Sequence, residues 1–161
     1  MFGVFKPGKK NTDDQIDAIA KELFAQIEQA RDEAKSGGIV DEKVFNDRLN
    51  SMFVAGYLIS YVDECLADIS SDNAVKKRAA EHVFETMFPG SGIDFVKTRL
   101  IARQKAPAIS KEDPNLGAIA EQCRVFDAGM LFAQEEVEKS DKDKGFHPSG
   151  LKQYLLLGET L

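Results

Sequence analysis

The sequence predicts an all-α fold, an antiparallel helical bundle of about five helices followed by a short C-terminal helix. Apolar side chains recur at alternating spacings of three and four over long stretches, which places them on one face of an α-helix. Glycine and proline are few and clustered, whereas an all-β protein needs them at many turns. The length of 161 residues suits one domain, so we expect a single helical domain over 1–161, with residues 1–11 as a flexible N-terminal arm.

The first predicted helix begins at Thr12, whose hydroxyl can cap free amide groups while Gln15 completes a capping box. It ends at Gly37–Gly38, because glycine accepts the left-handed backbone at a helix end. Its apolar stripe consists of Ile16, Ala20, Leu23, Ile27, Ala30 and Ala34. The short connection that follows predicts an antiparallel hairpin with the next helix.

A second helix is expected from Asp41 to about Ser70. Within it, residues 52–62 are apolar around nearly the whole circumference, as in a helix that other elements cover on every side. A lone bundle of four or five helices usually leaves each helix one solvated face. This segment therefore predicts a further partner, most simply a second copy of the chain in a homodimer.

Proline and glycine divide the rest of the chain. A third helix is predicted from about Asp72 and a fourth over 92–105, just before Pro107; together they form one bundle member interrupted at Pro89–Gly90. The last long helix begins with Asp113–Pro114, a cap followed by proline in the first helical position. Residues 151–157 are expected to form the short terminal helix.

Two of these helices share the pattern F-x-A-G-x-L, at 53–58 and at 126–131. Chance similarity between short apolar segments is favoured over an old duplication. Gly56 and Gly129 in these segments each weaken a helix by about 1 kcal/mol relative to alanine. We therefore expect each glycine to mark a place where two helix backbones cross closely; the wall of a cavity is the second explanation.

No apolar run is long enough for a signal peptide at the start of the chain or for a membrane span elsewhere. We therefore expect a cytoplasmic protein in which Cys65 and Cys123 are reduced thiols within apolar helical patterns.

Short motifs for catalysis or metal binding are absent. His82 and His147 are preceded three positions earlier by Ala79 and Lys144, so the Glu-x-x-His motif of di-iron bundles is missing. Neither a glycine-rich phosphate loop nor a G-x-S-x-G nucleophile turn occurs. We expect no metal ion and no cofactor, we assign no catalytic residue, and the sequence favours a protein that is not an enzyme.

The predicted function is a non-catalytic helical protein-interaction module that self-associates; its specific role does not follow from the residues. The alternative is a small anionic-ligand binder or an enzyme, with a pocket between the predicted helices at 41–70, 92–105 and 113–137. Its candidate ligand-binding residues are Asp63, Tyr57, Arg99 and Arg103.

Each candidate also has a structural explanation. Asp63 extends the apolar line of its helix, where an ionised carboxylate needs a partner. A salt bridge to a neighbouring helix, or rotation toward water, is favoured over a buried acid in a pocket, and Tyr57 can supply polar contacts on the same helix. Arg99 and Arg103 lie four apart on one helical face, where they can grip a carboxylate or a phosphate.

The charge of the chain is unevenly spread. Residues 73–111 carry eight basic and three acidic side chains, within a chain of net charge −6. Segment 97–111 suggests nucleic-acid contact as a third hypothesis, but the negative total and the lack of interleaved aromatics oppose it, so no nucleic acid is expected. Pairing of these cations with acidic residues of this chain or of a second copy is favoured.

Overall fold

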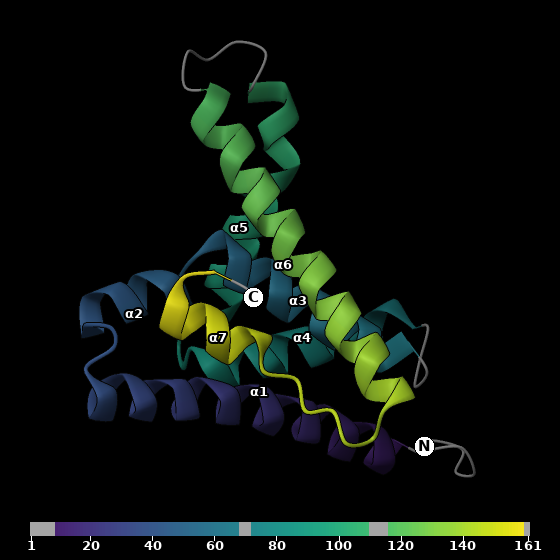
Figure 1. The fold of residues 1–161 in the computed structure, drawn as a ribbon. Coiled ribbons are helices and arrows are strands. Elements are labelled where there is room, and N and C mark those ends of the chain that lie inside the picture. The colour runs from purple at the N-terminus through teal and green to yellow at the C-terminus, as the bar shows by residue number, and fades with distance from the viewer. Residues whose placement is uncertain (1–8, 68–71, 110–115, 160–161) are drawn as a thin grey trace.

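The structure, a computed structural model, describes residues 9–67, 72–109 and 116–159. Within those ranges it contains seven α-helices and no strand, which confirms the predicted all-α fold. The helices are α1 (Lys9–Gly37), α2 (Glu42–Leu49), α3 (Met52–Ala67), α4 (Asn73–Met87), α5 (Gly92–Ile109), α6 (Leu116–Lys142) and α7 (Gly150–Leu157) (Figure 1). In the same ranges, the helices fall short of the length and apolar character that crossing a membrane requires.

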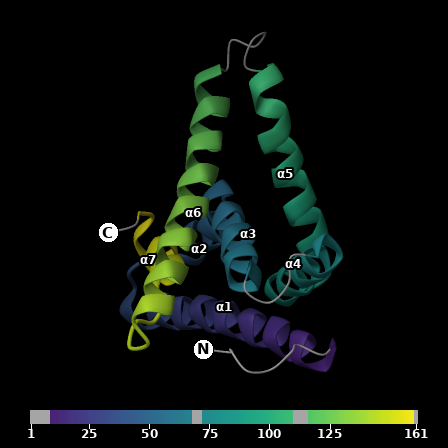
Figure 2. The same cartoon turned by 90° about the vertical axis from the view of Figure 1, so that its right-hand side faces the viewer.

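α3 lies at the centre of this bundle. α1 runs across one end of the molecule, and both α4 and α7 lie against it (Figure 1). Figure 2 shows α5 and α6 as two long helices that approach each other far from α1 and diverge toward it, with α3 between them. The bundle is therefore splayed: its helices share a core around α3, while α5 and the N-terminal half of α6 extend beyond that core.

The first helix begins at Lys9, so the prediction that Thr12 caps it is wrong. Thr12 lies within the first two turns and is buried. Lysine has a higher intrinsic helix propensity than threonine, and Lys9 and Lys10 extend the helix toward Pro7–Gly8 in the sequence.

The single helix predicted from Asp41 to Ser70 is two helices, because the chain breaks at Asn50 and Ser51. The Asn50 side-chain amide donates to the carbonyl of Asn46 at 2.8 Å, which closes the last turn of α2. The Ser51 hydroxyl accepts from the amide of Val54 at 3.3 Å, at the start of α3. Asparagine and serine compete in this way for backbone groups, which is why they favour helix ends.

The predicted boundaries of the third and fourth helices need one correction. Asp72 caps α4 as expected, since its side chain accepts from the amide of Ala74 at 2.9 Å. α5 continues through Pro107 to Ile109 rather than ending at Lys105; proline removes one amide donor there but holds φ in the helical range. The predicted cap at Asp113 lies outside the described residues.

The interruption predicted at Pro89–Gly90 is present between α4 and α5. α5 leaves α4 at a steep angle instead of continuing its direction (Figure 2). A β-carbon on Gly92 would collide with the backbone of Phe84, so glycine permits this tight turn.

The apolar segment of α3 is covered by the same chain. Every residue from Phe53 to Val62 is buried except Ile59, which is half-buried. Side chains of α1, α4, α6 and α7 complete the same core cluster. The segment therefore needs no second copy to cover it, and the sequence argument that led from it to a homodimer loses its premise.

Candidate functional site

α3 and α6 cross with their backbones in contact at Gly56 and Gly129. A β-carbon on Gly56 would collide with the carbonyl oxygen of Phe126, and one on Gly129 with the carbonyl oxygen of Phe53. Each glycine thus faces the residue three positions before the other, so the crossing is symmetric. The expectation that the two glycines mark helix crossings is confirmed, and both belong to the same crossing.

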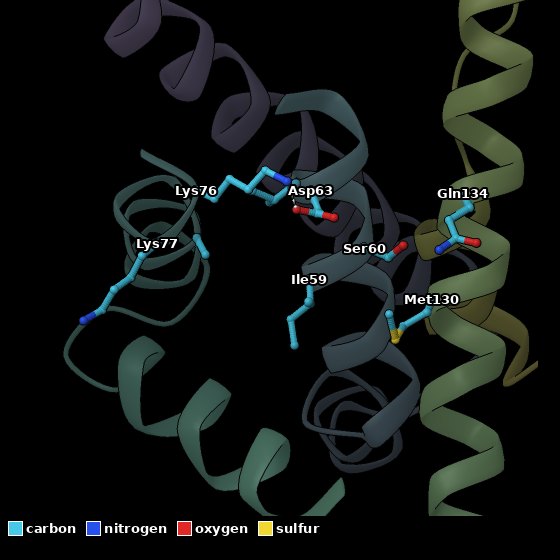
Figure 3. A pocket seen from close by; sticks show the side chains of 9 residues that line it. Ile59, Ser60, Asp63, Lys76, Lys77, Met130 and Gln134 are labelled. Carbon is cyan, nitrogen blue, oxygen red and sulfur yellow. Dashed lines mark ion pairs between the residues drawn. The ribbon is translucent and has the colours of Figure 1, made fainter. Parts of the chain in front are cut away.

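This crossing positions one wall of a pocket of about 250 Å³ between α3, α4 and α6 (Figure 3). Its apolar lining is Ile59, Val62, Ala80 and Met130, and its polar lining is Ser60, Asp63, Lys76, Lys77 and Gln134. The sequence placed the pocket beside the helix at 92–105, and the structure places it beside α4. α5 turns away at Gly92, which leaves α4 alongside α3.

Asp63 lies at the edge of this pocket and is not a buried acid. Its side chain is 57% exposed, and its Oδ1 lies 3.1 Å from Nζ of Lys76 on α4. The interpretation favoured from the sequence, a salt bridge to a neighbouring helix, is confirmed.

Deeper in the pocket, Ser60 on α3 and Gln134 on α6 face each other. Figure 3 shows their side chains pointing toward one another across the crossing. Ser60 is only 2% exposed, whereas Gln134 is half-buried. The pocket therefore combines an apolar wall, a neutral polar pair and, at its edge, an ion pair.

Tyr57 lies on a different face of α3, outside the pocket lining. It is fully buried, and its hydroxyl donates to Oε1 of Glu136 at 2.7 Å. Burial raises the pKa of Tyr57 well above its ordinary value, and the neighbouring carboxylate adds to that effect. Its role here is to pair a polar group inside the core.

Among the residues whose side chains the structure describes, the buried acid is Glu136, which was not among the candidates predicted from the sequence. It is 5% exposed and also accepts from the amides of Ser149 at 2.8 Å and Gly150 at 3.0 Å. A β-carbon on Gly150 would collide with Phe132 and with Glu136, so only glycine lets α7 come this close. One signal was available: Glu136 stands three positions after Ala133 and one before Val137, at the edge of the apolar stripe.

Arg103, one of the two predicted arginines, does not line the pocket. Arg103 forms a bidentate salt bridge with Asp127 on α6: Nε donates to Oδ1 at 3.0 Å, and Nη2 donates to Oδ2 at 2.9 Å. Pairing with an acid of the same chain was the favoured interpretation, and for Arg103 it is confirmed. The side chain of Arg99 lies outside the described part of the structure.

Of the three candidate residues whose side chains the structure describes, Asp63 alone lines the pocket. The sequence did not indicate that Ser60, Lys76 or Gln134 would join it there, because each is an ordinary polar residue on an amphipathic helix. Only the packing angle of three helices brings them together.

The described residues hold no cluster of three or more metal-ligating side chains. Cys65 and Cys123 are free thiols, each half-buried. Burial raises the pKa of the Cys65 thiol to about 12, and the charge of Glu22 adds to the shift. Because the thiolate is the reactive form, Cys65 is a weak nucleophile at neutral pH.

Comparison of the chain with protein-family models, with curated proteins and with solved structures finds no match.

Proposed function

We propose that this protein is a non-catalytic helical interaction module that self-associates through a projecting arm. The arm consists of residues 97–109 of α5 and 116–127 of α6. The observation that carries the proposal is its position: these two segments run side by side away from α1, α4 and α7 (Figures 1 and 2). Apart from Val125 and Phe126 at its base, which pack against the core, this helical hairpin lies outside the shared core, and it presents two long surfaces to a partner.

The charges of the two helices favour a second copy of this chain as the partner. Within the arm, residues 97–109 of α5 carry four basic side chains and no acidic one, whereas residues 116–127 of α6 carry two acidic and one basic, so the net charges are +4 and −1. In a two-fold pair of arms, α5 of one copy lies against α6 of the other, and opposite charges meet at both contacts. Ile101, which is 48% exposed on α5, offers an apolar contact within that surface.

Sedimentation velocity and light scattering at micromolar concentration test the proposal. We expect a dimer that dissociates as the salt concentration rises, because exposed charges are screened. A monomer at every concentration would reject self-association.

Charge reversal locates the contact. One variant carries Lys97→Glu and Lys105→Glu on α5, and a second carries Glu121→Lys on α6; all three side chains are exposed. Each variant alone should be monomeric, since like charges meet at both contacts. Mixed together, the two should form a heterodimer, because every contact is complementary again.

The matched control is Lys144→Glu, an exposed charge reversal in the loop after α6, which should leave the dimer intact. Circular dichroism of each variant checks that the helices are retained. A dimer that survives in both charge-reversed variants would move the interface away from the arm.

A further inference from the structure

The rest of the molecule holds α7 at both of its ends. At the first turn, Oε1 of Glu136 accepts from the amide of Gly150 at 3.0 Å. At the last turn, Nη1 of Arg48 donates to two carbonyls of α7, at 3.1 and 2.9 Å. Ser149, the residue before the helix, makes no capping bond with its side chain. Side chains of α6 and α2 therefore complete both ends of α7.

The side of α7 that faces the body is apolar and well packed. Leu151 and Leu155 are fully buried, and the rings of Tyr154 and Phe53 stack with centroids 4.1 Å apart. α7 packs mainly on α1 and α2, which are distant from it in the sequence. The residues that bind α7 are called here the docking surface: Glu33, Arg48, Phe53, Phe132 and Glu136.

α7 depends on this docking surface for its helical structure. Isolated helices shorter than about 12 residues are marginal in water, and α7 has eight residues. Docking and folding of α7 are therefore one event, decided by its own sequence. The loop at 143–149 adds only a connection: Figure 1 shows it running from the end of α6 across α1 to α7.

We infer that α7 is exchangeable between molecules, so that the docking surface of one copy binds residues 149–158 of a second copy through the same contacts. Exchange of an identical element preserves every contact of the closed molecule. The ligand is a short helix with glycine first and leucine second and sixth. Glycine is required because a β-carbon on Gly150 would collide with Phe132 and Glu136. The docking surface lies away from the arm, so the inference does not rest on the proposed function.

A labelled peptide of residues 148–159 tests the docking surface, with binding followed by fluorescence anisotropy. The acceptor is the full chain carrying Gly150→Ala, whose own α7 cannot dock without the collision. We expect saturable binding at least about tenfold tighter than to the wild-type chain, where the tethered α7 competes. Circular dichroism checks that the acceptor is folded.

The wild-type chain makes the test independent of any effect of Gly150→Ala on folding. At millimolar concentration, the same peptide should shift the amide resonances of Glu33, Arg48 and Phe53. No binding to the wild-type chain and none to a folded acceptor would overturn the inference.

Two leucines of the peptide provide a matched pair. Leu155→Ala in the peptide should weaken binding by about tenfold or more, because Leu155 is fully buried in the docked helix. Leu157→Ala should change binding by less than about twofold, since Leu157 is 47% exposed. Equal losses would show non-specific apolar binding and would contradict the docked geometry.

A mixture of two full-length chains tests the second copy as the source of the helix. The acceptor carries Gly150→Ala, and the donor carries Arg48→Met, which weakens its own docking surface. Both also carry Lys97→Glu and Lys105→Glu, so that the arm contributes no dimer. Sedimentation should show a 1:1 complex in the mixture and monomers in each chain alone. Monomers in the mixture would overturn exchange between copies, whatever the outcome for the arm.

Discussion

The hydroxyl of Tyr57 on α3 donates to the carboxylate of Glu136 on α6 at 2.7 Å, and both side chains lie inside the core. The same carboxylate accepts from two amides at the start of α7. One buried acid thus connects three helices, and its negative charge stands at the helix end where the backbone dipole favours it.

The first prediction concerns this acid. Glu136→Gln should lower the free energy of unfolding by about 2–3 kcal/mol, because an amide nitrogen then faces the donors of Ser149 and Gly150. Tyr57→Phe should cost about 2 kcal/mol by removing one hydrogen bond to a charged group. Urea unfolding measures both. Their effects should be non-additive in the double variant, since the two side chains share one bond.

Glu135→Gln is the matched control, one position earlier and exposed. It should change stability by less than about 0.5 kcal/mol. A loss for Glu136→Gln no larger than that of the control would show that the buried bonds are not made in solution.

The second prediction concerns the crossing of α3 and α6. Gly56→Ala and Gly129→Ala should each destabilise the fold by about 2 kcal/mol or more, because the new methyl group collides with a backbone carbonyl that cannot move freely. The higher helix propensity of alanine alone would raise the free energy of unfolding by about 1 kcal/mol. A net loss of stability would therefore come from the collision at the crossing. Thermal unfolding measures it.

Gly145→Ala provides the control for glycine replacement. Its added β-carbon would lie 3.3 Å from a side-chain oxygen of Asp143, in a loop, and should change stability little. Stabilisation by both helix substitutions would contradict the close crossing.

The crossing is also where the sequence was most informative. A glycine in the middle of an apolar helix has a cost that close packing of two backbones explains better than a cavity wall does, so Gly56 and Gly129 could be assigned to crossings without coordinates. Spacing of apolar residues likewise placed most helices. It could not show that the two glycines meet each other, because helix pairing depends on contacts between distant parts of the chain.

The candidate site was harder to predict for the same reason. Asp63 was singled out as an acid on an apolar line, but which neighbour would pair with it depends on the angle of α4. The buried acid that the structure shows, Glu136, is stabilised by backbone amides at the start of a short terminal helix. The sequence around Glu136 does not predict that contact. The break at Asn50–Ser51 was missed because the apolar spacing continues across it, and capping by side chains outweighed that spacing.

The third prediction concerns the far end of α7. Arg48 on α2 donates from Nη1 to the carbonyls of Leu155 at 3.1 Å and Leu156 at 2.9 Å. A cation at this helix end complements the acid at the other end. Arg48→Met should lower stability by about 2 kcal/mol and should increase amide hydrogen exchange in α7 first.

Arg78→Met removes an exposed arginine that pairs with Asp13, and it should cost less than about 1 kcal/mol. Exchange that increases evenly over the whole chain in Arg48→Met, rather than first in α7, would contradict the local role of Arg48.

The fourth prediction concerns alkaline pH. Burial raises the pKa of Tyr57 and Tyr61 above the ordinary value of 10.0, and it raises the pKa of Cys65 to about 12 from 9.0. Groups whose pKa is raised by folding contribute stability that is present below their unfolded pKa and is lost as pH rises above it. Each such group lowers the free energy of unfolding by up to about 1.4 kcal/mol per pH unit in that range.

Urea unfolding at pH values from neutral to strongly alkaline measures this slope, while absorbance reports tyrosinate. Tyrosinate from Tyr57 and Tyr61 should form together with the unfolding transition, because neither side chain can ionise inside the core. Tyr61→Phe should make the alkaline loss of stability shallower, since one of the linked groups is gone. Titration of both buried tyrosines near pH 10, with the helices still intact by circular dichroism, would mean that water reaches the core around α3. That result would contradict the burial of α3 on all sides.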